Sequence, residues 1–192
     1  MGMMLLGMVL FLGVHSVRIF ADGGRDSLIR RLGPGAYKGL YSLASIAGFV
    51  LIVWGYGLTR TAPVDLWMPP VWTRHIAALL TIPAFVLLAA AYVPGTAIKA
   101  AVGHPMVMGV KVWAFSHLIA NGRLADVVLF GGFLAWAVLL YIASRKRDRR
   151  TGTRYVSGPA SRDVIAIVAG LAAWAAFAFW LHGALIGVRP FG

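Results

Sequence analysis

Six apolar segments follow one another along the chain, and nearly all of the charged residues lie in the connections between them. Five of these segments are long enough for a helix that crosses the hydrocarbon core of a membrane, which takes about 20 residues. The fourth segment is shorter. In chain order, the expected helices cover residues 3–20, 37–58, 72–93, 105–120, 124–143 and 164–188. The pattern therefore predicts an all-α fold, a polytopic transmembrane bundle of six spans that forms a single domain over residues 1–192.

The short fourth segment carries polar side chains at a depth where an unpaired polar group is costly. Pro105 suits the first turn of a helix, and Asn121-Gly122 suits a helix end and a tight turn, so we expect the fourth helix to pair with the fifth. Lys111 is expected to extend its ammonium group to the polar rim near the start of this helix. At ~100° per residue, His117 shares one helical face with Met106, Val110, Trp113 and Asn121.

The composition also indicates a membrane protein, because 60% of the residues are hydrophobic and only 12% are charged. Soluble domains average about 45–50% apolar and ~25% charged residues. The net charge of +12 does not predict a nucleic-acid partner, since the basic residues gather in the connections between apolar segments. The absence of cysteine excludes disulfides, thiolate zinc sites, iron–sulfur clusters and thiolate-ligated haem.

The basic residues are distributed unequally between the two sides of the predicted bundle. Thirteen Lys and Arg residues lie in the connections after the first, third and fifth helices, and four lie on the opposite side. Cytoplasmic loops of membrane proteins carry the excess of Lys and Arg. This split predicts a multi-pass protein of a bacterial inner membrane, in contact with membrane lipid and with both termini on the periplasmic side.

Two of the five histidines suggest a haem site. His15 lies in the first span, and Arg18 follows one turn nearer the basic rim. Such an imidazole can bind iron while the guanidinium pairs a haem propionate, although a lone helical histidine also fits a hydrogen-bonded packing role. At 1.5 Å per residue, His15 and His117 lie ~8 Å and ~17 Å from the basic ends of their helices. This offset permits an axial pair in tilted helices without requiring one.

The other histidines allow alternatives. His75 and His182 are expected toward the less basic side, where they form a rival ligand pair or a hydrogen-bonded relay. His104 precedes Pro105 at the basic rim, where it is expected to cap the helix or contact a headgroup. The remaining polar candidates are aspartates expected in loops or at the rim, namely Asp65, Asp126, Asp148 and Asp163. The sequence shows no carboxylate dyad and no serine triad.

These residues resemble the NnrU family, which also includes the plant 15-cis-zeta-carotene isomerases. The resemblance covers nearly the whole chain. It rests on Val14-His15-Ser16 with Arg18, on His75, on His104-Pro105-Met106 with Gly109, on Trp113, His117 and Asn121-Gly122, and on Asp148-Arg149-Arg150, Arg154-Tyr155 and His182. The plant isomerases carry haem b, and their proposed axial histidines match His15 and His117. Bacterial members are associated with denitrification and nitric oxide reduction.

The resemblance implies a haem-b-binding protein, with His15 and His117 as iron ligands and with Arg18, Trp113 and His104 contributing to the cofactor site. The leading expectation is a role in nitric oxide or nitrite metabolism. The second is a haem-dependent cis–trans isomerase acting on a carotenoid-like polyene, in which His15 and His117 would be catalytic. The isomerases have arginine before the His-Pro pair, whereas this chain has Gly103, which favours the first expectation.

Two further alternatives stay open. A more distant resemblance links the chain to membrane methyltransferases of isoprenylcysteine, which share an Arg-His-Pro motif that helps to bind S-adenosylmethionine. Those enzymes have an acidic cluster after the next helix, whereas residues 145–162 here are strongly basic. A haem-free structural or assembly factor is the other alternative.

Overall fold

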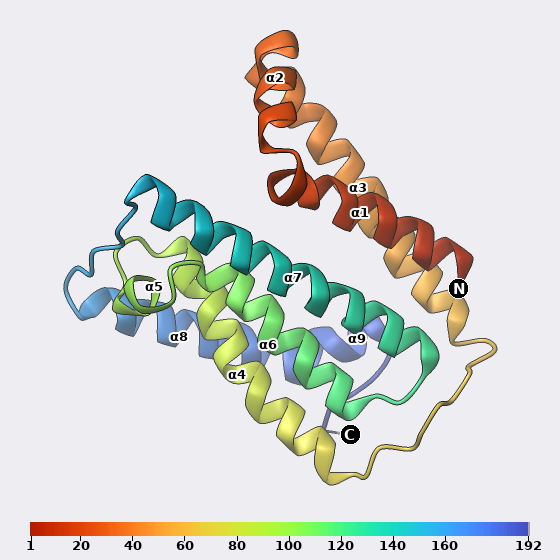
Figure 1. Ribbon diagram of the computed structural model, residues 1–192. Coiled ribbons are helices and arrows are strands. Elements are labelled where there is room, and N and C mark those ends of the chain that lie inside the picture. Colours follow the sequence, from red (N-terminus) through yellow and green to blue (C-terminus); the bar gives the residue numbers. More distant parts are fainter. Residues whose placement is uncertain (192) are drawn as a thin grey trace.

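The computed structural model describes residues 1–191, and the regular elements in that range are all helices. They are α1 (Gly2–Phe20), α2 (Asp22–Leu32), α3 (Pro34–Thr59), α4 (Trp72–Tyr92), α5 (Ala97–Val102), α6 (Pro105–Ala120), α7 (Leu124–Thr151), α8 (Ser161–Ala176), a π-helical turn η1 (Phe177–Leu181) and α9 (His182–Ile186). Five helical segments are long and apolar enough to cross a membrane, and the shorter apolar α6 lies among them (Figure 1). The all-α membrane bundle is therefore confirmed.

The structure has more helix in the connections than the sequence analysis predicted. Residues 22–32 form α2, with Asp22 in its first turn and Arg30 and Arg31 in its last turn, where these charges complement the helix dipole. Thr96 caps α5 by accepting a hydrogen bond from the Lys99 N–H at 3.0 Å. The basic run after residue 143, which was predicted to be a connection, instead continues α7. Asp148, one turn from the end of α7, contacts His104 at the start of α6 and Tyr155 in the following connection.

The transmembrane helices pack in a row in the order α3, α1, α7, α6, α4 and α8. In Figure 1 the α1–α3 pair lies beside α7 near the N-terminus and diverges from it toward α2. The main core cluster joins α1, α3 and α7, through Met4, Met8, Ile52, Ala125, Leu129 and Phe130. The row explains how one helix, α7, contacts both α1 and α6, the helices that carry His15 and His117.

Small residues allow α1 and α3 to approach closely. A Cβ atom added to Gly48 would lie 2.7 Å from the Phe11 backbone nitrogen, and one added to Gly7 would lie 2.5 Å from the Ile52 backbone nitrogen. In lipid, where no hydrophobic force drives helices together, close van der Waals packing at small residues is a main source of association.

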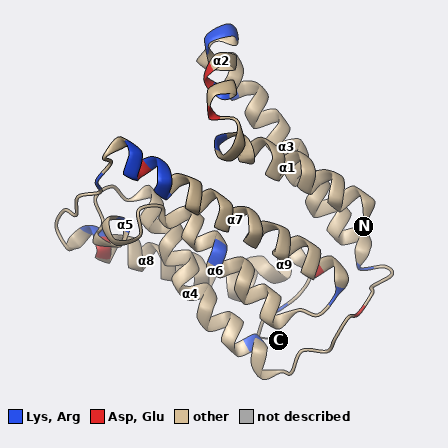
Figure 2. Ribbon diagram, viewed as in Figure 1, with Lys and Arg blue, Asp and Glu red and all other residues tan. Residues whose placement is uncertain are grey.

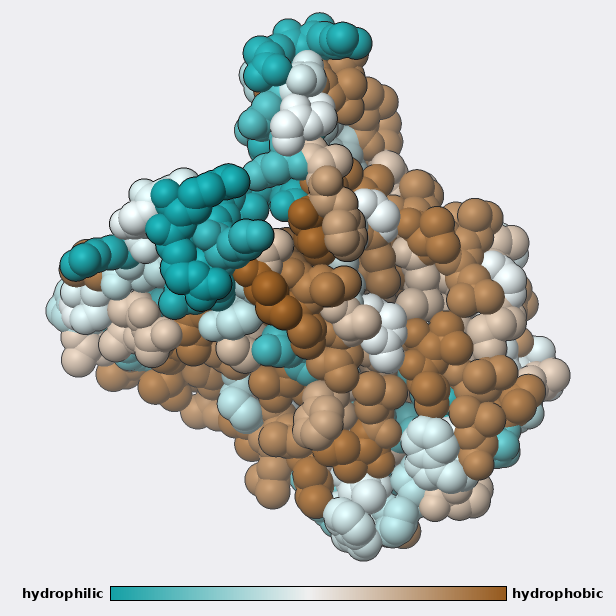
Figure 3. Space-filling view, in the orientation of Figure 1, coloured by the Kyte–Doolittle hydropathy of each residue, from teal (hydrophilic) through white to brown (hydrophobic). Residues whose placement is uncertain are grey.

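Charge and hydropathy divide the molecule along the direction of the helices. Lys and Arg gather around α2 and the end of α7, while the opposite end carries few charges (Figure 2). Most of the surface between the two ends is apolar in the view of Figure 3, as expected for side chains that face lipid. In the same view the surface is hollowed between α2 and the basic end of α7, where an ion pair joins Arg147 to Asp22 at 3.8 Å.

Candidate functional site

His15 is held in one orientation by its own helix. Its Nδ1 donates a hydrogen bond to the Phe11 carbonyl oxygen at 2.7 Å, and its ring stacks on the Phe11 ring with 4.2 Å between centroids. Tyr41 of α3 and Trp136 of α7 flank the imidazole at 5.2 and 6.0 Å. Because a carbonyl oxygen only accepts, Nδ1 carries the hydrogen and Nε2 presents its lone pair. This is the arrangement by which proteins orient a metal-binding imidazole.

His117 repeats this arrangement on α6. Its Nδ1 donates to the Trp113 carbonyl oxygen at 2.8 Å, again four residues earlier, and its ring lies 5.2 Å from the Trp113 ring. The His117 ring also stacks on Phe130 of α7, with 4.6 Å between the ring centroids. Asn121 donates to the His117 carbonyl oxygen at 2.8 Å and so fixes the last turn of the helix. As at His15, the free ring nitrogen is Nε2.

The two imidazoles face α7 at different levels, and aromatic side chains connect them. The series runs from His15 through Phe11, Phe133 and Trp113 to His117, with successive centroids 4.2, 5.8, 5.7 and 5.2 Å apart. His15 lies beside residue 136 of α7 and His117 beside residue 130, a difference of ~9 Å along the axis. The two predicted ligands therefore belong to one aromatic cluster, but their rings are not in direct contact.

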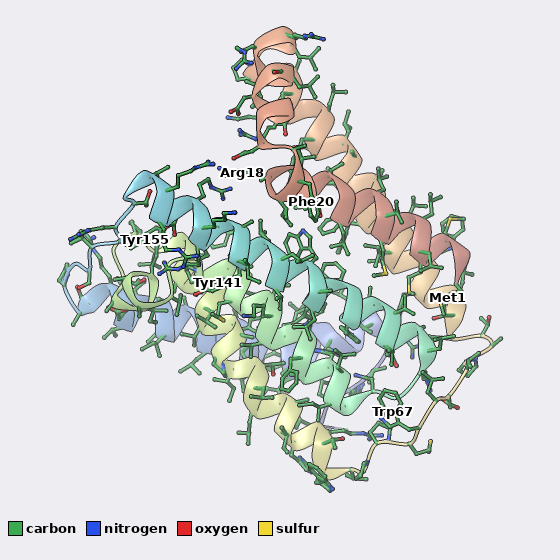
Figure 4. The ribbon with its side chains drawn as sticks, viewed as in Figure 1. Met1, Arg18, Phe20, Trp67, Tyr141 and Tyr155 are labelled. Atoms are coloured by element: carbon green, nitrogen blue, oxygen red, sulfur yellow. The ribbon has the colours of Figure 1, made fainter. Side chains whose placement is uncertain are left out.

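One buried polar group lies beside His15, and two cations lie beyond the end of α1. Trp136 Nε1 is buried and has no hydrogen-bond acceptor within residues 1–191. Arg18, at the end of α1, lies 3.9 Å from Asp22 and is half exposed (Figure 4). Arg147 reaches the same Asp22 from α7. The guanidinium groups of Arg18 and Arg147 thus lie near Asp22, just beyond the end of α1.

The rival histidines occupy different surroundings. His75 is exposed near the start of α4 and stacks on no aromatic ring within residues 1–191. His182 follows η1, donates from Nδ1 to the Val188 carbonyl oxygen at 2.6 Å and meets the Phe177 ring edge-on at 5.7 Å. No hydrogen bond joins these two side chains in the described chain. Likewise, no three histidine or carboxylate side chains of residues 1–191 converge as they would to enclose a metal ion by themselves.

His104 is part of a cluster that the sequence analysis missed. Its Nε2 lies 2.9 Å from Asp148 Oδ2, and the Tyr155 hydroxyl donates to both oxygens of this carboxylate at 3.2 and 3.3 Å. Arg145 lies 3.5 Å from the same carboxylate. Burial and the Asp148 charge raise the pKa of Tyr155, so the hydroxyl keeps its proton. His104 occupies the N-cap position of α6 as predicted, but its ring binds Asp148 instead of capping the helix.

Asp126 was expected at the rim, and it does lie in the first turn of α7, but its side chain is only 2% exposed. The Tyr56 hydroxyl donates to it at 2.6 Å from α3. A pocket of about 250 Å³ opens beside this pair and includes Arg60 and Arg123 in its lining. Asp126 binds Tyr56, which is distant in the sequence, and Asp148 binds Tyr155, which lies beyond the last turn of α7. The periodicity of single helices does not reveal such contacts.

A family model described as "NnrU protein" matches residues 3–190 of this chain. The chain belongs to the NnrU family. No curated protein and no solved structure matches it. The family match covers all six apolar spans, so both His15 and His117 lie within the matched region.

The side chains around His15 and His117 include groups of the kinds that could hold a haem. The two partly buried imidazoles offer nitrogen ligands, and the chain has no cysteine to offer instead. The unpartnered Trp136 Nε1 beside His15 supplies a buried donor that lacks an acceptor. Arg18 and Arg147 place cations at the rim, suited to carboxylates. These donor types are compatible with haem, in which the imidazoles would bind the iron and Arg18 and Arg147 would pair the carboxylates.

Proposed function

We propose that this NnrU protein binds haem b, with His15 and His117 as the iron ligands, and that it acts in the metabolism of nitric oxide or nitrite. One observation carries the proposal. Two histidines on different helices share the same local geometry, in which Nδ1 is bonded to the carbonyl oxygen four residues earlier and Nε2 is left as the ligand nitrogen. Packing residues also make such bonds, but here both rings enter one aromatic cluster on α7.

Bound haem would supply one-electron chemistry and binding of diatomic ligands at iron. The protein's own contribution is orientation and shielding. The carbonyl groups of Phe11 and Trp113 fix the two ring planes, and the aromatic side chains around them exclude water. Arg18 would hold a propionate near the end of α1.

Gly103 favours nitrogen-oxide chemistry over polyene isomerisation. Its φ of +74° is a conformation that side-chain-bearing residues rarely adopt. A Cβ atom there would lie 2.5 Å from Arg145 Nη1, so an arginine at this position would have to displace the Arg145 side chain. This supports the nitric oxide assignment, with isomerisation of a polyene as the second candidate.

The assignment of ligands is tested by alanine variants of the purified, haem-loaded protein. We expect His15→Ala and His117→Ala to lose haem or to convert it from low spin to high spin, as read from the absorption spectrum and electron paramagnetic resonance. His75→Ala is the control, because His75 is exposed and outside the aromatic cluster, and it should leave the spectrum unchanged. Unchanged spectra in both single variants would contradict this ligand pair and favour His75 with His182.

The chemical role is tested by two parallel assays. Nitric oxide titrated into the ferrous protein should give a nitrosyl spectrum, and expression in a host that accumulates the poly-cis polyene should give no isomer conversion. Conversion that is lost in His117→Ala would reverse the ranking of the two functions. A protein that binds haem but shows neither result would have a structural or assembly role.

A further inference from the structure

A second site, separate from the aromatic cluster, lies at the start of α6. A pocket of about 270 Å³ opens there, and its lining includes Lys99, His104 and Tyr155 together with Ala91, Met106 and Val107. One part of its lining is polar and consists of the Lys99 ammonium, the His104 imidazole and the Tyr155 phenol. The other part consists of apolar side chains from α4 and α6, of which Met106 is 40% exposed. The pocket thus combines charged and lipid-like surroundings at the basic end of the bundle.

The polar part has a positive charge balance. Lys99 makes no ion pair with a carboxylate of residues 1–191. The acidic group nearest to the pocket's His104 and Tyr155 is Asp148, and its oxygens are already bonded by both of these residues and approached by Arg145. Lys99 is therefore a cation of the lining with no carboxylate partner in residues 1–191, whereas the Asp148 charge is shared by His104, Tyr155 and Arg145. An anion entering the pocket meets unpaired positive charge.

The backbone adds donors in the same place. His104 makes no side-chain capping bond to α6, because its ring is bonded to Asp148. The N–H groups of Met106 and Val107, in the first turn, consequently have no acceptor within their own helix. Such groups together with the helix dipole favour a phosphate oxygen. These N–H groups add hydrogen-bond donors to a site whose main features are the Lys99 charge and the pocket.

The backbone around Lys99 is fixed in place by several contacts. Asp163 of α8 accepts hydrogen bonds from the N–H groups of Ala97 and Ile98 at 3.0 and 3.1 Å. The fully buried Thr96 caps the same helix through the Lys99 N–H. The short helix α5 is thereby anchored to α8, which holds the Lys99 backbone beside the start of α6.

We propose that this pocket binds the phosphate of an anionic phospholipid whose headgroup lies in the leaflet at the basic end of the protein. The ammonium of Lys99 and the first-turn N–H groups of α6 would contact phosphate oxygens. The apolar side chains of Ala91, Met106 and Val107 would contact the glycerol and the start of the acyl chains. This apolar part of the lining selects a lipid phosphate over free phosphate, which has nothing to place there.

The test uses the full-length protein in detergent or in phosphatidylcholine nanodiscs doped with phosphatidylglycerol. Native mass spectrometry counts the phosphatidylglycerol molecules that remain bound. Lys99→Met should lower the affinity about fivefold, as expected for the loss of one lysine near a lipid headgroup. Lys99→Arg keeps the charge and should retain most of the binding. Lys38→Met is the matched control, since Lys38 is exposed on α3 in another part of the basic end.

Three results would overturn the proposal. Equal losses in Lys99→Met and Lys38→Met would indicate general charge attraction without a site. Unchanged binding in Lys99→Met would place the lipid elsewhere. Displacement of phosphatidylglycerol by millimolar inorganic phosphate, in a manner that depends on Lys99, would identify a site for the free anion. The folded fraction of each variant is measured by size-exclusion chromatography, so that a loss of binding is not confused with misfolding. None of these results depends on haem.

Discussion

At the scale of single residues, the chain places its few polar groups at membrane depth in defined contacts. His15 and His117 each donate to a carbonyl group of their own helix, and Asp126 accepts from Tyr56. A polar group in hydrocarbon is costly when unpaired, so each of these contacts removes part of that cost. Within residues 1–191, Trp136 Nε1 is a buried donor without an acceptor, and it lies beside His15. An acceptor supplied by a bound group would account for it.

The contact between Tyr56 and Asp126 joins α3 to α7, and its removal should weaken the fold. Tyr56→Phe deletes the hydroxyl that donates at 2.6 Å and leaves a buried carboxylate oxygen without this partner. We expect a loss of about 2 kcal/mol in the free energy of unfolding, measured by thermal or denaturant unfolding in detergent. Tyr92→Phe is the control, because Tyr92 is 78% exposed. Equal stability of the two variants would show that the contact contributes nothing.

Arg18 should affect retention of haem without affecting its spin state. Its side chain is half exposed at the end of α1, one turn beyond His15, and is not a candidate iron ligand. Arg18→Ala should therefore raise the rate at which haem transfers to apomyoglobin while the low-spin spectrum of the bound fraction stays the same. A change to high spin would mean that Arg18 positions His15. An unaltered transfer rate would remove Arg18 from the site.

At the scale of helices, the α1–α3 pair depends on glycine. The Gly48 Cα lies against the Phe11 backbone, whereas a Cβ atom added to Gly57 of the same helix would meet nothing within 4 Å. Gly48→Ala should cost about 1–3 kcal/mol through overpacking. Gly57→Ala should be neutral or stabilise the helix by up to ~1 kcal/mol. Thermal unfolding of the two variants tests this difference, and a similar loss in both would contradict the close approach at Gly48.

The limits of the spans were predictable, whereas the contacts between them were not. Pro105 and Asn121-Gly122 define the short α6 because proline and glycine act locally on the backbone. Helix α2 was missed because Gly23-Gly24 and clustered charges resemble a loop. The partners of Asp126 and Asp148 include residues 70 and 44 positions away in the sequence. Such pairings arise only when helices pack, so the apolar pattern of each helix cannot reveal them.

At the scale of the whole molecule, the distribution of charge predicts orientation. The ends of α1 and α7 and the starts of α3 and α8 lie at the basic end, and the four cations in or beside the opposite connections lie at the other (Figure 2). Loop cations favour the cytoplasmic side. The connection between α3 and α4 at the opposite end packs on the α6–α7 turn, where the Leu66 N–H donates to the Gly122 carbonyl oxygen at 2.8 Å near Trp67 (Figure 4).

Reporter fusions test this orientation. A reporter that is active only in the periplasm should give signal when fused to the C-terminus and no signal when inserted near residue 152, after the end of α7. A reporter that is active only in the cytoplasm should give the reverse pattern and serves as the control. The opposite result for both reporters would mean that the charge bias does not set the topology, or that α6 does not cross the membrane.

The most direct test of the account is the visible absorption spectrum of the purified wild-type protein, recorded oxidised and then after reduction with dithionite. Ligation of haem b by His15 and His117 predicts a Soret band in both states and sharp α and β bands on reduction, in proportion to the protein concentration. A protein that is folded and purified from haem-replete cells, yet shows no Soret band and takes up no added haemin, would contradict the central claim.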